Sequence, residues 1–155
     1  MAKQQPLSAA LDAFILSVAP PHIPSPDAPN ESEALFDWAA SHVVGVDPIP
    51  VWDGASDDSI YGSPEVNYAY RAWHDATHIK LGLDFSMESE EQVSLAHVRE
   101  AWDAGLSAED CRLLWIDSQG QNEYFKVHGD FVPNQREFAL LALEHGIEFA
   151  INATA

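Results

Sequence analysis

Two histidines and their polar neighbours are the residues of this sequence best suited to do chemistry. Asn67, Arg71, His74 and His78 are spaced so that they would share one face of a helix. Two imidazoles one helical turn apart can bind the same metal ion, because both project in the same direction. The spacing therefore predicts a metal site with an arginine beside it.

A second polar stripe follows. Glu90, Ser94 and His97 are also spaced for one helix face, and a helical hairpin would turn that face toward the first stripe. We expect the metal ligands to be His74, His78, His97 and Glu90. Three imidazoles and one carboxylate suit a divalent metal ion such as Zn²⁺, Mn²⁺, Fe²⁺ or Ni²⁺. The alternative is a polar network without metal, in which the same groups neutralise one another.

These residues favour a metal-dependent enzyme, most simply a hydrolase. The ion would acidify a bound water, and a spare carboxylate, Asp75 or Glu90, would act as general base. Arg71 would hold an anionic group such as phosphate, so the substrate would be a small, phosphate-containing or nucleotide-like molecule. The candidate catalytic residues are Asp75, Glu90 and Arg71.

A third polar cluster spans residues 118–122, with the sequence SQGQN, and Tyr124 follows it. Gly120 is a poor helix residue, which predicts a bend or a close approach to a ligand at this point. Amide side chains can read the polar edges of a nucleotide. We therefore expect a substrate-binding set that comprises Arg71, Asn67, Gln121, Asn122 and Tyr124.

The hydrophobic pattern assigns these stripes to helices of one domain, residues 1–155. Helices are expected over 7–18, 31–44, 64–80, from Ser86 or Ser89 to 103, from 107 to Phe125 or His128, and from 133 almost to the C-terminus. The predicted fold is an all-α, compact bundle of about six helices, with an N-terminal helix within 1–19 and a core with the site over 64–150.

Two segments rich in proline and glycine precede the central helical hairpin. Residues 20–30 contain five prolines, which predicts a stiff connection without regular structure. Residues 45–64 predict a long loop with one short strand near Ile49, Val51 and Trp52.

Composition limits the classes of function. Seven Lys and Arg residues against 25 Asp and Glu give a formal net charge of −18, which disfavours direct binding to nucleic acid or anionic membranes. The single cysteine, Cys111, excludes a disulfide framework and thiolate metal sites. No signal peptide or membrane-spanning stretch is apparent, so we expect a soluble, cytoplasmic protein.

The three clusters together resemble a domain of large multidomain "polyvalent" phage and mobile-element proteins. The resemblance covers about residues 65–140 and rests on Asn67-x-x-Tyr70-Arg71-x-x-His74-Asp75-x-x-His78, Phe85, Glu90-Glu91, His97, Gly120-Gln121-Asn122-x-x-Phe125 and Asn134-Gln135. Thr77 and Ser89 stand where that family usually has glycine. The resemblance implies a phage context, hence the cytoplasm of an infected bacterium, and a shared polar site of uncharacterised activity.

Three other functions fit the sequence. A non-haem iron oxygenase could use the same ligands. A phosphohydrolase of the HD type would combine His42 and His74-Asp75 with Asp103 or Asp117. An acidic inhibitor that mimics nucleic acid would instead bind a basic host protein, and it would not need His74.

Overall fold

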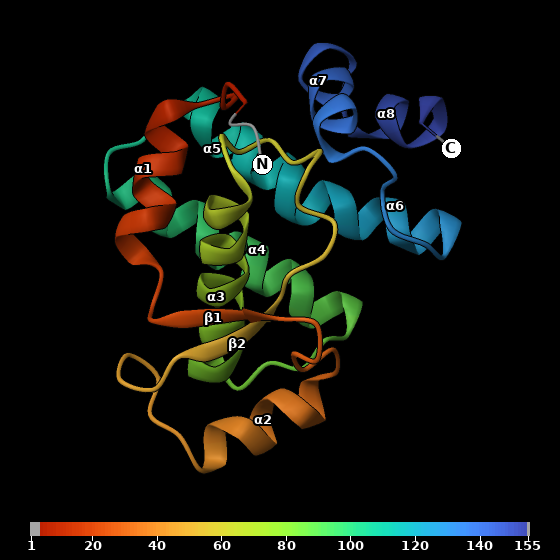
Figure 1. Cartoon of the computed structure of the whole chain (residues 1–155). Helices are drawn as coiled ribbons and strands as arrows, with labels where there is room; N and C mark the ends of the chain where they lie inside the picture. The colour runs from red at the N-terminus through yellow and green to blue at the C-terminus, as the bar shows by residue number, and fades with distance from the viewer. Residues whose placement is uncertain (1–3, 155) are drawn as a thin grey trace.

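Helices dominate the computed structural model, which describes residues 4–154 (Figure 1). The α-helices are α1 (Ala9–Val18), α2 (Ser32–Ala40), α3 (Pro64–Leu81), α4 (Met87–Asp103), α5 (Ala108–Trp115), α6 (Gln121–His128), α7 (Gln135–His145) and α8 (Ile147–Ala153). A π-helix, η1 (Ile116–Gly120), joins α5 to α6. The predicted helical character is confirmed, but a purely α fold is not, because two short strands are also present.

The helix pair that carries the site begins and ends where local sequence signals place it. Ser63 precedes α3 as its N-cap, Pro64 is its first residue, and Gly82 ends it with a φ of 66°. Proline at the first turn and glycine at the left-handed end are the usual solutions to unpaired backbone groups. The Ser86 hydroxyl accepts a hydrogen bond from the Ser89 amide and caps α4. These caps fix where the polar stripes lie along each helix.

The proline-rich connection contains a strand, contrary to the prediction that it lacks regular structure. β1 (His22–Ser25) pairs in parallel with β2 (Ile49–Trp52), and α2 forms the crossover between them. Pro24 is tolerated because each strand of a two-stranded sheet is an edge strand, where a missing N–H need not break a ladder. Ile49 and Val51 of β2 are buried together with Ala72 of α3. The sheet thereby holds the loop after β2 beside α3.

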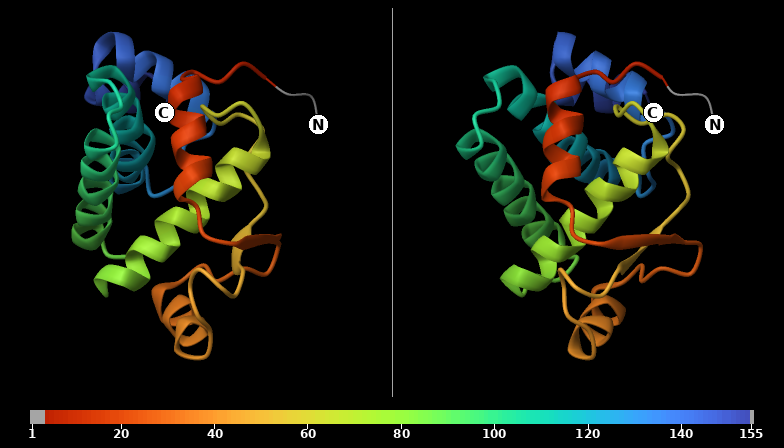
Figure 2. Two further views of the ribbon diagram at one scale, coloured as in Figure 1. Left: turned by 90° about the vertical axis from the view of Figure 1, so that its left-hand side faces the viewer. Right: turned by 60° about the vertical axis from the view of Figure 1, so that its left-hand side comes forward.

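The main core lies where α1, α3, α5, η1, α7 and α8 meet. Figures 1 and 2 show α1 against α3, the sheet and α2 at one end of the molecule, and α7 with α8 at the other. Large side chains that are fully buried include Leu11, Ile15, Tyr61, Leu114 and Phe138. Burial of these side chains joins the helix pair that carries the predicted site to η1 and α7 in one core.

A π-helix interrupts the long helix that was predicted from residue 107 to His128. Its residues 116–120 are all buried, although three of them are polar. A Cβ on Gly120 would lie 3.2 Å from the ring of Phe138, tighter than ordinary contact. The sequence predicted a bend or a close approach to a ligand at Gly120, and the close approach that the structure shows is to the ring of Phe138. π-Helical turns within α-helices often mark functional sites, because they redirect side chains.

The helix predicted from residue 133 is divided into α7 and α8. Asn134 caps α7 by accepting a hydrogen bond from the Glu137 amide. Gly146, with a φ of 96°, separates the two helices. None of the helices within residues 4–154 combines the length and hydrophobicity that a bilayer crossing requires.

Candidate metal centre

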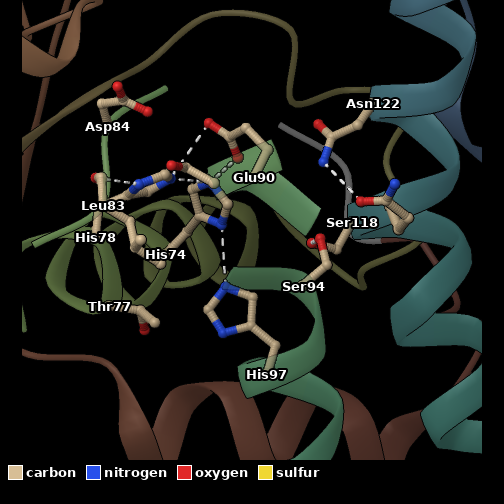
Figure 3. Close-up of polar contacts among 12 residues, drawn as sticks. His74, Thr77, His78, Leu83, Asp84, Glu90, Ser94, His97, Ser118 and Asn122 are labelled. Atoms are coloured by element: carbon tan, nitrogen blue, oxygen red, sulfur yellow. Dashed lines mark hydrogen bonds and ion pairs between the residues drawn. The ribbon is translucent and has the colours of Figure 1, made fainter. Parts of the chain in front are cut away.

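Three side chains from α3 and α4 bring their ligand atoms together at the predicted hairpin (Figure 3). The Nε2 atoms of His74 and His78 lie 3.1 Å apart. One carboxylate oxygen of Glu90 lies 3.1 Å from His74 Nε2, and the other lies 3.2 Å from His78 Nε2. Ligand atoms about 2.0–2.1 Å from a tetrahedral metal ion would be about 3.3 Å apart. The group His74, His78 and Glu90 could therefore hold a metal ion.

The tautomer of His78 supports this fit. Its Nδ1 lies 2.9 Å from the carbonyl oxygen of Leu83, which can only accept a hydrogen bond, so Nδ1 carries a proton. In neutral His78, Nε2 then presents a lone pair toward Glu90. Gly82 turns the chain back at the end of α3 and so places Leu83 against His78. A histidine that binds metal typically makes such a contact through its other nitrogen.

His97 lies behind His74 and not beside the three ligand atoms. Its Nε2 is 3.0 Å from Nδ1 of His74, and it is fully buried. Glu90 and His97 are seven positions apart on α4, which is about 10 Å along a helix, and they contact opposite ring nitrogens of His74, Glu90 at Nε2 and His97 at Nδ1. His97 therefore moves from the predicted ligand set to the role of a partner that orients His74.

The His97 ring also contains an unpaired polar atom. Its Nδ1 has no hydrogen-bond partner among the described residues. Burial, together with the nearby His74 and His78, lowers the pKa of His97 well below its ordinary value. His97 is thus neutral, and its Nε2 can accept a hydrogen bond from the Nδ1–H of His74, which leaves His74 Nε2 free to bind a cation.

The site favours a positive charge between His78 and Glu90. Burial alone would raise the pKa of Glu90, but its contacts with His74 and His78 outweigh burial and lower the pKa to about 2. Burial likewise opposes a charge on His78, but the contact with Glu90 outweighs it and raises the pKa of His78. A metal ion bound between His78 and Glu90 would supply the same positive charge that a proton supplies.

Two neighbouring cavities border the metal group. The larger, of about 560 Å³, is lined by Trp52, Arg71, His74, Asp75 and residues of the proline-rich connection. The smaller, of about 390 Å³, is lined by His74, Glu90 and side chains from η1 and α6. Asn30, His74 and Phe131 line both. Of the metal group, His74 therefore lies where the two cavities meet, Glu90 lines the smaller cavity, and His78 is buried behind them.

Arg71 anchors the loop that forms one wall of the larger cavity. Its Nη1 donates hydrogen bonds to the carbonyls of Trp52, at 2.5 Å, and Gly54, at 2.7 Å, and Nη2 donates to Ala55. Ala55 has a φ of 49°, which is unusual for a residue with a side chain. Within residues 4–154 the Nε–H and one Nη2 hydrogen form no hydrogen bond, so they can meet an anionic group in the cavity. Arg71 thus has a structural role that the sequence did not reveal.

Arg71→Lys should destabilise the protein by roughly 1–3 kcal/mol, because an ammonium cannot bond three carbonyls in this fixed arrangement. The free energy of unfolding in urea measures the loss. Arg99→Lys is the matched control, since Arg99 is exposed on α4. Equal effects of the two substitutions would contradict the anchoring role.

Asp75 lines the larger cavity next to His74, as the sequence allowed. Burial raises its pKa to about 6, although His74 and His78 partly oppose the shift. Asp75 lies outside the three-residue metal group of the described chain. Its position suits proton transfer at the cavity edge more than metal binding.

Two of the predicted substrate-binding residues lie away from both cavities. Asn67 is buried and donates a hydrogen bond to Ser56. Tyr124 is also buried and packs against His128 and Phe138. Both support the framework around the site.

The other three predicted residues line the cavities: Arg71 lines the larger one, and Gln121 and Asn122 line the smaller one. The two amides project from α6 directly after η1.

The alternative arrangement with His42 receives no support from the geometry. His42 is exposed, and its ring stacks on Trp38 at a centroid distance of 4.5 Å. Asp103 is exposed at the end of α4. His74, Asp75 and Asp117 of that set line the cavities, whereas His42 and Asp103 line neither.

Asp117 and Ser118 both line the smaller cavity, although the predicted catalytic, substrate-binding and metal sets did not include them. The sequence named Asp117 for the HD-type alternative alone and Ser118 as part of the polar cluster. Asp117 accepts hydrogen bonds from the hydroxyl of Tyr61 and from Gln121, both at 2.8 Å. The Ser118 hydroxyl lies 2.7 Å from that of Ser94 on α4. The one sequence signal that could have linked Asp117 to the predicted site is its spacing of four residues from Gln121, which places the two side chains on one helix face. The π-helical turn, which a sequence pattern does not reveal, makes both residues face the cavity.

Asp117→Asn should remove a dependence of stability on pH. Burial raises the pKa of Asp117 from 3.8 to about 6, against hydrogen bonds from Tyr61 and Gln121. Between these values the folded protein keeps a proton that the unfolded chain releases, so wild-type stability falls as pH rises. The free energy of unfolding of wild type minus variant should fall by up to about 3 kcal/mol between about pH 4 and pH 7. Parallel pH curves from urea unfolding would refute the shift.

Comparison of the chain with protein-family models, curated proteins and solved structures found no match.

Proposed function

We propose that the chain is a metal-dependent hydrolase whose metal ligands are His74, His78 and Glu90. The observation that carries the proposal is the convergence of three side chains beside two cavities: two imidazole nitrogens lie 3.1 Å apart, and each lies 3.1 or 3.2 Å from one oxygen of the Glu90 carboxylate. Nitrogen and carboxylate ligands suit zinc, manganese or iron. A bound divalent ion supplies Lewis acidity and lowers the pKa of a water toward neutrality.

Asp75 is the proposed general base. Its carboxylate lines the larger cavity beside His74, where it can take a proton from a water molecule. Glu90, which the sequence also suggested for catalysis, is assigned to the metal because both of its oxygens face the imidazoles.

Arg71 is the proposed contact for an anionic group of the substrate. It lines the larger cavity, and its Nε–H and one Nη2 hydrogen are not used by the loop carbonyls. A phosphate or carboxylate there would receive a charge-assisted hydrogen bond. The proposed substrate is a small molecule with its anionic end in the larger cavity.

The resemblance to the polyvalent phage domain supports a phage or mobile-element origin and, with it, action in the bacterial cytoplasm. The residues of that pattern include His74, His78 and Glu90. We keep this context as part of the proposal.

Asp75→Asn should lower kcat by about 100-fold or more, which is the usual contribution of general acid–base catalysis. The metal-loaded full chain would be assayed with nitrophenyl phosphate, phosphodiester and carboxylic ester substrates. Metal content should be unchanged in the variant. Asp103→Asn, with the same change of charge on an exposed residue, should retain full activity.

A metal-loaded chain that hydrolyses none of these bonds would contradict the proposal, as would full activity of Asp75→Asn. If the purified protein contains iron and consumes oxygen, the oxygenase alternative replaces hydrolysis.

A further inference from the structure

The smaller cavity beside the metal group has four aromatic side chains in its lining. Tyr70 lines it from α3, Phe85 from the turn before α4, Phe125 from α6 and Phe131 from the loop after α6. The rings of Phe125 and Phe131 lie 5.3 Å apart, and Phe131 is 76% exposed. Aromatic walls of this kind bind apolar groups and, through their electron-rich faces, organic cations.

The charged groups of this lining are acidic. Among the described residues that line it, Glu90 and Asp117 carry negative charges and no Lys or Arg is present. Asp117 is only 6% exposed, and it forms no ion pair within residues 4–154. Each of its oxygens accepts one hydrogen bond, from Tyr61 or Gln121, and a carboxylate oxygen can accept two. A buried carboxylate without a cationic partner is costly unless a ligand supplies the cation.

The two amides of the lining add hydrogen-bond acceptors. Gln121 uses its NH₂ group toward Asp117, and Asn122 uses its NH₂ group toward Gln119. The Asp117 carboxylate can only accept a hydrogen bond, so it fixes the Gln121 amide with its nitrogen toward Asp117. Neither amide oxygen has a partner among the described residues. The cavity therefore offers a carboxylate and two carbonyl oxygens next to an aromatic wall.

We infer that the smaller cavity binds the ammonium group of a small primary amine, with Asp117 as its counter-ion and its carbon skeleton against Phe85, Phe125 and Phe131. An ammonium has three N–H donors and no acceptor, which matches a lining of acceptors. An anionic ligand would instead face Glu90 and Asp117. A substrate with an ammonium at one end and an anionic group at the other would span both cavities. This last point rests on the proposed function, whereas amine binding itself does not.

Benzylamine and benzyl alcohol are the probes, because they share a ring and differ in charge. Titrations of the full chain after treatment with a chelator, near neutral pH, would follow ligand and protein signals by NMR. We expect benzylamine to bind at least about 10-fold more tightly than benzyl alcohol, a difference of about 1.4 kcal/mol. Adenosine, the probe for a nucleotide-like ligand, should not compete.

Asp117→Asn should weaken benzylamine binding by about 10-fold or more and leave the weak binding of benzyl alcohol unchanged. Asp103→Asn is the control with the same change of charge. Since Asp117 is buried, its variant must first show a cooperative unfolding transition. Phe131→Ala is the second variant, because this exposed side chain can be removed without harm to the core, and it should also weaken benzylamine binding.

Equal affinity for benzylamine and benzyl alcohol would overturn the inference, as would competition by adenosine. Unchanged benzylamine binding by both Asp117→Asn and Phe131→Ala would overturn it too. Metal uptake without amine binding would refute this inference alone, whereas amine binding without metal uptake would refute the proposed metal enzyme alone.

Discussion

His78→Ala should abolish stoichiometric metal binding and lower affinity by at least about 100-fold. Structural zinc sites bind with about 10–16 kcal/mol over four ligands, so the loss of one ligand costs about 3 kcal/mol or more. Glu90→Gln should have a similar effect while it preserves the shape of the side chain. Metal content of untagged protein after reconstitution, measured by inductively coupled plasma mass spectrometry, and calorimetric titration provide the readouts. His42→Ala, which removes an exposed histidine elsewhere, should bind metal like wild type.

In the same metal-binding measurements, His97→Gln should cause a partial loss of affinity. If His97 orients His74 without touching the ion, its replacement should weaken metal binding by about 10–100-fold and not abolish it. Complete loss would restore His97 to the ligand set. Failure of the wild-type chain to take up any metal would favour the metal-free polar network.

Phe138→Ala should destabilise the protein by about 3–5 kcal/mol, the usual cost of truncating a buried aromatic ring. Phe138 is 1% exposed, and its ring lies 5.9 Å from that of Tyr124. It also packs against the backbone at Gly120. The melting temperature should fall by about 6–20 °C for a domain of this size. Calorimetry or thermal circular dichroism measures the change.

Leu140→Ala is the matched control for Phe138→Ala. Leu140 lies on the same helix, but it is 50% exposed, so its loss should cost less than about 1 kcal/mol. Similar effects of the two substitutions would mean that α7 is not anchored through Phe138.

The sequence predicted the helix pair and most of the metal group because those features are local. Spacing of four residues places His74 and His78 on one face of any helix. Proline, serine and glycine signals then fix the ends of α3 and α4. The pairing of Glu90 with these histidines needed only the assumption of a hairpin.

The prediction was wrong for the proline-rich connection, where the interactions are not local. β1 pairs with residues 27 positions later, with His22 opposite Ile49. Four-residue strands carry too little pattern to be recognised without their partner. The position of Asn30 could not be predicted either, because Asn30 lines the cavities only where the sheet brings the proline-rich connection against α3.

The sequence by itself determined that the chain is mainly helical, strongly acidic and equipped with two histidines and a carboxylate at metal-binding spacing. Tertiary structure alone decided which groups share the site. The packing of the helices placed His97 behind His74. It also brought Arg71 against the loop after β2, where three of its N–H groups bond to backbone carbonyls. The π-helix, in turn, directs the side chain of Asp117 toward the smaller cavity. The physical reason is that helix periodicity fixes the direction of a side chain about its own axis, whereas the axial offset between packed helices depends on the whole core.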